Sequence, residues 1–244
     1  FIGEFSMTRI AIDAMGGDYA PAAIVDGAVW AAIDYNVPIE LVGKEDAIKA
    51  ELERIAKKGI SSNRGGYYTH RLKVDLNSLD IKITDAQEVI EMGEAVGQAI
   101  RKKRKSSIVL AVDAVAKGSS DAVVAAGSTG AAMAASLFGL GRLQGIERPA
   151  IALTLPTIKR PFMLLDAGAN SSCTPEMLYQ FALMGTTFVK NVYGYENPRV
   201  GVLNIGEEAG KGNELVQKTY KMLEENQDGL NFIGNVEGKE IFKG

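Results

Sequence analysis

Short apolar runs alternate with longer amphipathic stretches along most of the chain. The apolar runs predict strands at residues 9–14, 38–43, 79–84, 121–126, 150–155, 162–166, 199–205 and 230–234. The amphipathic stretches predict helices at residues 21–35, 44–58, 94–105, 107–117, 129–143, 175–191 and 213–226. Apolar strands that alternate with helices are typical of a parallel sheet covered on both faces. The pattern therefore predicts a three-layer α/β fold with a largely parallel sheet.

Three parts of the chain depart from this alternation. Residues 61–77 have no clean period and predict an irregular excursion. Residues 1–6 precede Met7 without the basic and apolar regions of a signal peptide, so we interpret them as an expression scar. No helix is predicted after the last strand, which suggests a C-terminal truncation. We expect residues 7–244 to form a single α/β domain that is incomplete at its C-terminus.

Unusual loops follow four of the predicted strands. They contain glycines, small hydroxyls, amides and carboxylates, and they span residues 13–18, 126–131, 166–170 and 204–213. Ligands of open α/β sheets bind at the carboxyl ends of the strands. We therefore expect all four loops to form a rim along one edge of the sheet.

The second loop is the best candidate for a phosphate site. Gly127, Ser128, Thr129 and Gly130 connect a predicted strand to a predicted helix, where free N–H groups and the helix dipole favour an anion. The alternative is a simple N-cap with a closely packed turn, which requires no ligand.

The fourth loop is similar to a nucleotide-binding P-loop but does not match it. The spacing from Gly206 to Lys211 is one residue short, and Gly212 stands where Ser or Thr would bind magnesium. A lysine and Asn213 at a helix start still suit an anion. The alternative is a solvated Lys211 beside an Asn213 cap.

The first loop has adjacent glycines, Gly16 and Gly17, and therefore lacks the dinucleotide fingerprint. Asp13 and Asp18 in this loop could order it, hold a cation or transfer a proton, but such a pair is more often structural. The single histidine, His70, and the single cysteine, Cys173, are too few for a zinc site, and a Ser–His–Asp triad would have to recruit His70 from the irregular excursion. Cys173 precedes a predicted helix, which would favour its thiolate if it were catalytic. We expect no metal and no cofactor.

Composition narrows the class of protein. The chain has 244 residues, 46% of them hydrophobic, and a net charge of −3. That is enough to bury a core, and the weak charge argues against a general nucleic-acid binder. One cysteine excludes an internal disulfide and fits a reducing cytoplasm. No apolar run reaches the roughly 18–20 residues of a membrane span.

A run of cations ends one predicted helix. It consists of Arg101, Lys102, Lys103, Arg104 and Lys105. The run complements the negative end of the helix dipole and could be only a solvated face. The functional alternative is a docking patch for an acidic partner or an anionic membrane surface.

The chain resembles the bacterial phosphate acyltransferases of the PlsX family, from Met7 to its end. The matching motifs, in order, are Asp-Ala-Met-Gly-Gly-Asp at 13–18, Met-Gly-Glu at 92–94, Ile-Arg-Lys-Lys at 100–103, Ala-Gly-Ser-Thr-Gly-Ala at 126–131, Arg-Pro-Ala at 148–150, Asp-Ala-Gly-Ala-Asn at 166–170 and Lys-Gly-Asn-Glu at 211–214. Family members continue past Gly244, and residues 61–77 are longer and more polar than the family pattern.

The resemblance implies transfer of a fatty acyl group from acyl carrier protein to inorganic phosphate for phospholipid synthesis. It also implies a homodimer, loose association with the inner face of the membrane, and a fold similar to isocitrate and isopropylmalate dehydrogenases. The alternatives are a short-chain phosphotransacylase that uses acyl-CoA, a dehydrogenase of the same fold and a non-catalytic phosphate-binding scaffold. The missing dinucleotide fingerprint argues against the dehydrogenase.

For this reaction, we expect Gly127–Gly130 and Lys211–Asn213 to hold phosphate. Asn170 or Lys211 would polarise the thioester carbonyl. The remaining candidates order or line the substrate site: Asp13, Gly16, Gly17, Asp18, Asp166, Asn204 and Glu207. The basic run 101–105 would dock the acidic carrier protein.

Overall fold

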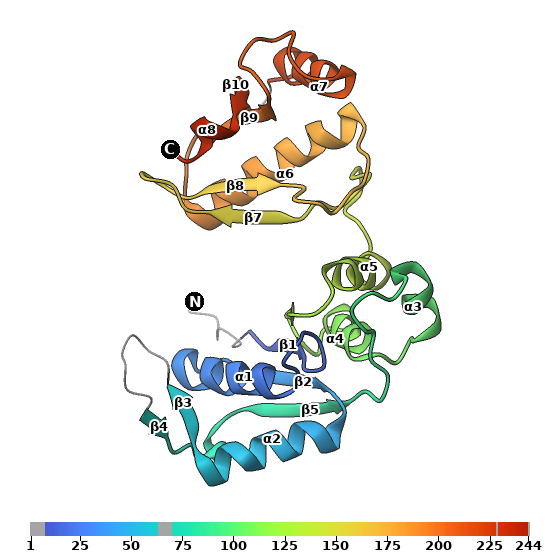
Figure 1. The fold of residues 1–244 in the computed structure, drawn as a ribbon, viewed down its shortest axis with the longest axis vertical. Helices are drawn as coiled ribbons and strands as arrows, with labels where there is room; N and C mark the ends of the chain where they lie inside the picture. The colour runs from blue at the N-terminus through green and yellow to red at the C-terminus, as the bar shows by residue number, and fades with distance from the viewer. Residues whose placement is uncertain (1–7, 63–69, 228, 244) are drawn as a thin grey trace, which may run out of the picture. The chain divides into compact units, whose positions relative to one another are not determined.

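The computed structural model describes residues 8–62, 70–227 and 229–243 (Figure 1). The chain divides into two compact units, residues 1–141 and residues 142–244. The single domain expected from the sequence stays a prediction. The expected expression scar, residues 1–6, lies outside the described residues.

Unit 1 contains a four-stranded parallel sheet with the order β5-β2-β1-β6. Its strands are β1 (Ile10–Asp13), β2 (Ile39–Gly43), β5 (Ile81–Asp85) and β6 (Ala122–Ala125). Ile12 on β1 lies opposite Leu41 on β2 and Val124 on β6. Because all four strands run the same way, the loops after β1 and β6 leave the sheet at one edge, as the sequence predicts.

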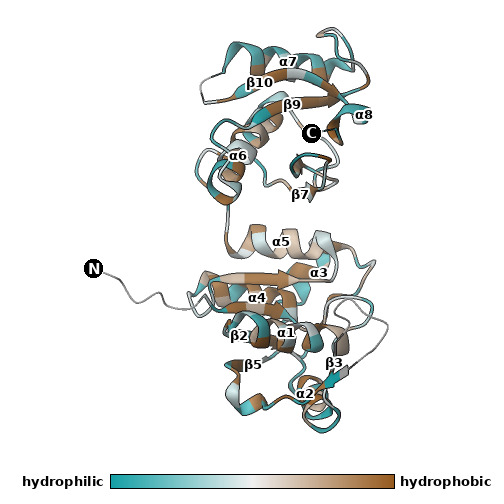
Figure 2. Ribbon diagram, turned by 90° about the vertical axis from the view of Figure 1, so that its left-hand side faces the viewer, coloured by the Kyte–Doolittle hydropathy of each residue, from teal (hydrophilic) through white to brown (hydrophobic). Residues whose placement is uncertain are grey.

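Helices cover both faces of this sheet. On one face, α1 (Ala22–Tyr35) and α2 (Glu45–Lys58) pack in a core with Ile12, Ile39 and Leu41. On the other face, α4 (Ser107–Ala116) places Ala111 and Ala114 beside Ala11 and Val42. Figure 2 shows hydrophobic residues both on the strands of unit 1 and on the helices that cover them. The three-layer α/β architecture with a parallel central sheet is confirmed.

Local signals set the ends of α2 as the sequence predicts. Glu45 and Asp46 occupy its first turn and Lys57 and Lys58 its last, which complements the helix dipole. Gly59, with φ of 73°, ends the helix, and its N–H donates to the carbonyl of Ile55.

Two further helices pack beside α4 and are shorter than predicted. They are α3 (Val96–Lys102) and α5 (Thr129–Gly139). α3 begins after Gly93, whose φ of 94° is left-handed, and α5 ends before Gly141, whose φ is 79°. Gly93 lies just before the range predicted for α3, whereas Gly141 breaks the helical backbone inside the range predicted for α5. Ile90, Ile100, Ile108 and Ala131 belong to the core shared by these helices.

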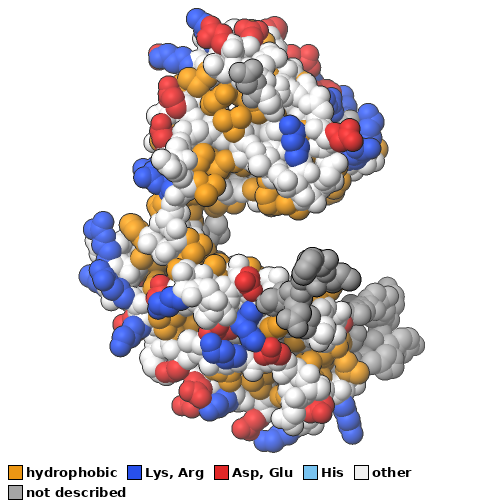
Figure 3. Space-filling view, turned by 180° about the vertical axis from the view of Figure 1, so that it is seen from behind, with side chains coloured by type: hydrophobic (Ala, Val, Ile, Leu, Met, Phe, Trp, Pro, Cys, Tyr) orange, Lys and Arg blue, Asp and Glu red, His pale blue; other side chains and the backbone are white. Residues whose placement is uncertain are grey.

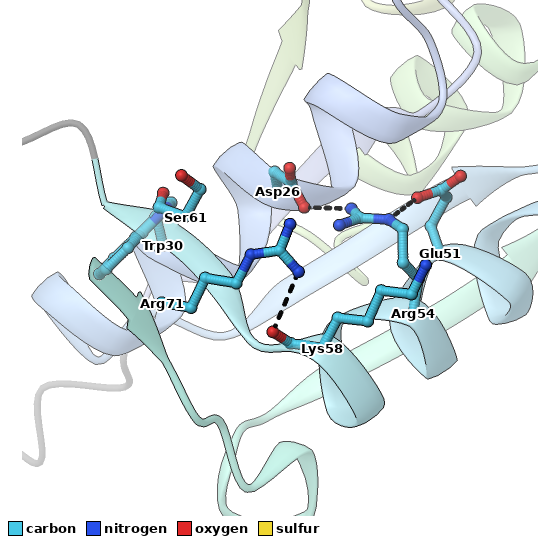
Figure 4. Close-up of polar contacts among 7 residues, drawn as sticks. All are labelled: Asp26, Trp30, Glu51, Arg54, Lys58, Ser61 and Arg71. Atoms are coloured by element: carbon cyan, nitrogen blue, oxygen red, sulfur yellow. Dashed lines mark hydrogen bonds and ion pairs between the residues drawn. The ribbon is translucent and has the colours of Figure 1, made fainter. Parts of the chain in front are cut away.

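Part of the predicted irregular excursion is regular, which corrects that expectation. β3 (Ile60–Ser62) and β4 (His70–Leu72) form an antiparallel pair, and a 3₁₀ turn, η1, spans Leu76–Ser78. Figure 4 shows how the pair attaches to the helices. Trp30 on α1 donates from Nε1 to the carbonyl of Ser61 at 3.2 Å, and Arg71 donates to the carbonyl of Lys58 at 3.3 Å. Such short strands have too few residues to show a period, and residues 63–69 lie outside the described residues.

An ion-pair cluster also joins α1 to α2. Arg54 on α2 lies 2.5 Å from Asp26 on α1 and also pairs with Glu51 (Figure 4).

Unit 2 begins with a hairpin that the prediction of a largely parallel sheet did not anticipate. β7 (Ala152–Leu155) and β8 (Phe162–Leu165) are antiparallel. Residues 156–161 connect them, whereas a parallel crossover needs about a dozen residues or more. The length of this connection in the sequence was the signal for the antiparallel pairing.

The rest of unit 2 keeps the predicted alternation. α6 (Pro175–Tyr193) precedes β9 (Arg199–Asn204), and α7 (Glu214–Glu225) lies between β9 and its parallel partner β10 (Asn231–Glu237). A short helix, α8 (Gly238–Ile241), follows β10. The sequence pattern predicted no helix there.

Candidate functional site

The loops after β1 and β6 meet through their glycines. A methyl group added at Gly127 would lie 2.9 Å from Cα of Gly16, and one added at Gly16 would lie 3.0 Å from the nitrogen of Gly127. Gly17 has φ of 104°, and a methyl group there would lie 2.9 Å from the carbonyl oxygen of Ala126. Only residues without a side chain allow this approach, so the adjacent glycines serve loop packing.

A small pocket opens where these loops meet, and we call it the glycine pocket. All of its lining belongs to unit 1: Asp13, Met15, Gly16, Gly17, Ile90, Glu91, Met92, Ile108, Ala125, Gly127, Ser128 and Ala131. The sequence predicted the contributions of the first and second loops. It did not indicate the wall formed by Ile90, Glu91 and Met92, although Met92 belongs to the Met-Gly-Glu motif at residues 92–94.

Asp13 is buried at the base of the glycine pocket. Its Oδ1 accepts a hydrogen bond from the N–H of Met15 at 3.1 Å. Burial raises the pKa of Asp13, while hydrogen bonds from Ser107, Met15 and Gly16 oppose the rise. These bonds make Asp13 an anchor for its own loop. Asp18, by contrast, is exposed and is not among the lining residues.

The start of α5 adds a helix N-terminus to the pocket, a feature that attracts anions. Ser128 is the N-cap, and its Oγ accepts from the N–H of Ala131 at 3.3 Å. Thr129 and Gly130 are the first helical residues, where N–H groups have no acceptor within the helix. The cap predicted as the alternative is therefore present, and its hydroxyl hydrogen can still donate to a ligand. Thr129 and Gly130 are exposed beside the pocket.

In unit 2, the loop after β8 is closed by its own side chains. Asp166 adopts a left-handed φ of 62°. Its Oδ1 accepts from the backbone N–H of Asn170 at 3.2 Å and from Nδ2 of Asn170 at 2.9 Å. Nδ2 also donates to the carbonyl of Pro149 at 3.0 Å. Asn170 therefore uses its amide group to order this loop.

Cys173 donates from Sγ to Oδ2 of Asp166 at 3.4 Å. Burial and the neighbouring carboxylate raise the pKa of Cys173, which favours the protonated thiol. The structure therefore works against the activated thiolate considered as an alternative from its position before a helix.

The loop after β9 folds around the start of α7. Asn204 donates from Nδ2 to the carbonyl of Lys211 at 3.1 Å, and Gly212 has φ of 86° with no room for a methyl group beside Asn204. Asn213 is the N-cap of α7, and its Oδ1 accepts from Val216 at 3.0 Å. The cap predicted for Asn213 is therefore confirmed. Lys211 and Glu207 are exposed on this loop.

The basic run divides into two kinds of residue. Lys103 lies 2.5 Å from the carboxylate of Glu94 and also donates to the carbonyl of Val89. The other four side chains are exposed: Arg101, Lys102, Arg104 and Lys105. Figure 3 shows Lys and Arg side chains at the edge of unit 1 where α3 lies.

The structure thus brings two of the four predicted loops together. Those after β1 and β6 share the glycine pocket, whereas those after β8 and β9 belong to unit 2. A common rim of all four loops stays a prediction.

The chain is similar in sequence to known proteins over most of its length. The family model described as "Fatty acid synthesis protein" matches residues 8–244. A phosphate acyltransferase of Pelotomaculum thermopropionicum is 50% identical over 236 residues, which cover 97% of this chain and 63% of that protein. One of Heliobacterium modesticaldum is also 50% identical and covers 97% of this chain and 64% of its own length. The chain spans a little less than two thirds of the length of these curated relatives.

Solved structures with the same fold are more distant in sequence. The EutD phosphotransacetylase from Staphylococcus aureus has a TM-score of 0.60 at 14% identity, covering 95% of this chain and 69% of that one. A branched-chain phosphotransacylase from Enterococcus faecalis has a TM-score of 0.56 at 14% identity, covering 94% and 68%. At this identity the likeness shows the fold alone. Among the described helices, none is long and apolar enough to cross a membrane.

The match over residues 8–244, with the glycine-lined loops in place, shows that the chain belongs to the fatty acid synthesis protein family, the PlsX family that contains the curated phosphate acyltransferases.

Proposed function

We propose that the protein transfers a fatty acyl group from acyl carrier protein to inorganic phosphate, as an acyltransferase of phospholipid synthesis. The observation that carries the proposal is the contact between Gly16 and Gly127, which creates a pocket beside the N-terminus of α5. Such a terminus attracts an oxyanion. The names of the curated relatives support the same activity.

The chemistry requires placement more than a strong base. A phosphate oxygen attacks the thioester carbonyl, a C–O bond forms, the C–S bond breaks, and the thiolate leaves and takes up a proton. Phosphate is already anionic at neutral pH, and a thiolate is a good leaving group. Positioning corresponds to effective molarities of about 10⁵–10⁸ M in well-oriented systems. One preorganised oxyanion donor contributes about 2.7–4 kcal/mol.

Unit 1 would supply the phosphate cradle. The N–H groups of Gly127–Gly130 and the hydroxyls of Ser128 and Thr129 would donate to phosphate oxygens. Asp13 would hold the first loop in place, with Gly16 and Gly17 allowing its approach to the second loop. Asp18 would order the same loop from its exposed side.

Unit 2 would supply the cation and the second set of amides. Lys211, Gly212 and Asn213 would bind phosphate or the thioester oxygen, because Lys211 has an exposed ammonium at the start of α7. Asn204, Glu207 and Asp166 would order these loops. For Asn170 to polarise the carbonyl, its amide would have to leave Pro149, so Lys211 is the stronger candidate.

The exposed cations Arg101, Lys102, Arg104 and Lys105 would attract the acidic carrier protein to unit 1. We also propose, from the family resemblance, a homodimer in the cytoplasm that associates loosely with the inner face of the membrane. The weak net charge gives no reason to propose a nucleic-acid partner.

A short-chain phosphotransacylase that uses acyl-CoA is the second candidate, because the two solved structures described above are named as a phosphotransacetylase and a phosphotransacylase. The test is acyl-phosphate formation by the full-length protein with acyl carrier protein thioesters and, separately, acetyl-CoA. Product from the carrier thioester supports the proposal. Product from acetyl-CoA alone favours the second candidate, and phosphate binding without either product favours a scaffold.

A further inference from the structure

We propose that Lys103 is a positioning residue, which holds one wall of the glycine pocket in place instead of docking a partner. The wall is formed by Ile90, Glu91 and Met92, and Val89 and Glu94 flank it in the chain. The kinetic part of this inference rests on the proposed function, whereas the structural part does not.

Lys103 contacts the chain on both sides of this wall. Its Nζ lies 2.5 Å from Oε1 of Glu94 and 2.7 Å from the carbonyl oxygen of Val89. Both side chains of the pair are about one third exposed, at 33% for Lys103 and 30% for Glu94. The hydrogen bond from Lys103 holds the pKa of Glu94 below its ordinary range, so this carboxylate is charged at neutral pH.

Glu94 connects Lys103 to the pocket wall. The same Oε1 that binds Lys103 accepts a hydrogen bond from the N–H of Glu91 at 2.7 Å. The N–H of Glu94 donates back to the carbonyl of Glu91 at 3.3 Å, and Gly93 turns the chain with φ of 94°. The turn from Glu91 to Glu94 is therefore closed around the carboxylate that Lys103 holds.

Other contacts hold the chain before this turn. The carbonyl of Glu88 accepts from the N–H of Ser107 at 3.0 Å, and its carboxylate accepts from the N–H of Lys105 at 2.9 Å. Ile90 is buried in the core shared with α4 and α5. Glu91 and Met92, which line the pocket, follow these anchors and depend on the Glu94–Lys103 pair.

Lys102, the neighbouring cation, differs from Lys103 in its contacts. Lys102 is exposed, and among the described residues no ion pair of its ammonium group is recorded. Sequence position alone gives Lys102 and Lys103 the same role. The geometry assigns Lys103 to the pocket and leaves Lys102 to the surface.

The test compares Lys103→Met with Lys102→Met in the full-length protein. Each change removes one ammonium group and retains an apolar side chain. Amide hydrogen exchange is measured at Glu91 and Glu94, together with KM for phosphate and for the acyl carrier substrate. We expect Lys103→Met to speed exchange at both amides by roughly tenfold, because their hydrogen bonds lose their fixed acceptor.

We also expect Lys103→Met to raise KM for phosphate by roughly three- to tenfold, because a small displacement of a positioning group is costly. Lys102→Met should leave both exchange and phosphate KM unchanged and alter only KM for the carrier. Glu94→Gln should reproduce the effect of Lys103→Met, and the double variant should be no worse than either single one. Exchange in β1 and β2, away from the wall, verifies that each variant is folded.

Two results would overturn the inference. One is unchanged exchange at Glu91 and Glu94 in folded Lys103→Met. The other is a loss of carrier affinity in Lys103→Met equal to that in Lys102→Met, with phosphate KM unaffected. If no acyl phosphate forms in the wild type, the proposed function fails, but the exchange measurement still decides the role of Lys103.

Discussion

The backbones of Gly16 and Gly127 touch, although more than a hundred residues separate them in the sequence. A methyl group at Gly127 would lie 2.9 Å from Cα of Gly16, closer than side-chain carbons normally approach backbone. This contact joins the loops after β1 and β6 and defines the glycine pocket. Its disruption should therefore affect both stability and phosphate binding.

Gly127→Ala should destabilise unit 1 by about 1–3 kcal/mol, the usual cost of overpacking. The added methyl meets backbone, which cannot rotate away. Thermal or urea unfolding of the full-length protein measures the loss. Gly27→Ala is the matched control, because Gly27 is exposed within α1 and a methyl group there meets nothing within 4 Å. It should stabilise α1 by up to about 1 kcal/mol, and an equal loss in both variants would contradict the argument.

Ser128→Ala and Lys211→Ala should each raise KM for phosphate if both groups bind the same anion. Loss of one donor to a charged group corresponds to about 1.5–3 kcal/mol, or roughly 10- to 150-fold in affinity. The double variant shows whether Ser128 and Lys211 bind the same anion, because residues that contact one ligand couple energetically. Fully additive effects, or an unchanged KM in Lys211→Ala, would remove Lys211 from the phosphate site.

Charge reversal at Lys102, Arg104 and Lys105 should weaken binding of the acidic carrier protein. Electrostatic attraction raises the association rate at low salt and is screened as salt increases. We therefore expect KM for the carrier to rise several-fold at low ionic strength and its salt dependence to flatten. Carrier kinetics that match the wild type at low salt would show that these cations are only a solvated face.

Asp13 should make stability depend on pH in a defined direction. Burial raises its pKa above the ordinary 3.8, so the folded state binds more protons than the unfolded state above that pH. Its contribution is complete below pH 3.8 and is lost as pH rises through the folded pKa. The stability of Asp13→Asn relative to wild type should therefore increase with pH, measured by urea unfolding from about pH 4 to 8.

The control is Asp18→Asn, which makes the same charge change at an exposed position of this loop. A stability difference between Asp13→Asn and wild type that falls with pH would show that Asp13 is not desolvated as described.

Cys173 should react slowly with iodoacetamide at neutral pH, because burial and Asp166 raise the pKa of its thiol. Asp166→Asn removes the neighbouring charge and should speed the reaction, while Asn still tolerates the left-handed backbone at this position. Because the chain has a single cysteine, Cys173→Ser gives the background of the labelling assay. Equal rates in wild type and Asp166→Asn would exclude the carboxylate as the cause.

Local signals in the sequence were sufficient for most elements. The period of residues 44–58 and the glycine that follows predicted α2, and the apolar runs predicted β1, β2 and β6 within one or two residues. Helix caps were also predictable from the sequence, since Ser128 and Asn213 both cap the helices that they precede. These features depend on neighbours in the chain, so the sequence displays them directly.

Pairing between distant segments was harder to predict from the sequence. The β3–β4 pair was missed because strands of three residues show no period. The antiparallel pairing of β7 and β8 was missed because apolar character alone does not indicate strand direction. Likewise, nothing in the run 101–105 distinguishes Lys103 from its neighbours.

By itself, the sequence determined the strand–helix alternation, the helix caps and the glycine-rich loops at the strand ends, since each arises from residues a few positions apart. Only the tertiary structure decided that Gly16 lies against Gly127, that Ile90–Met92 form the third wall of the pocket, and that Lys103 turns inward to Glu94. Those contacts join segments that are distant or unpatterned in the chain. They are fixed by packing and charge pairing, which local periodicity does not encode.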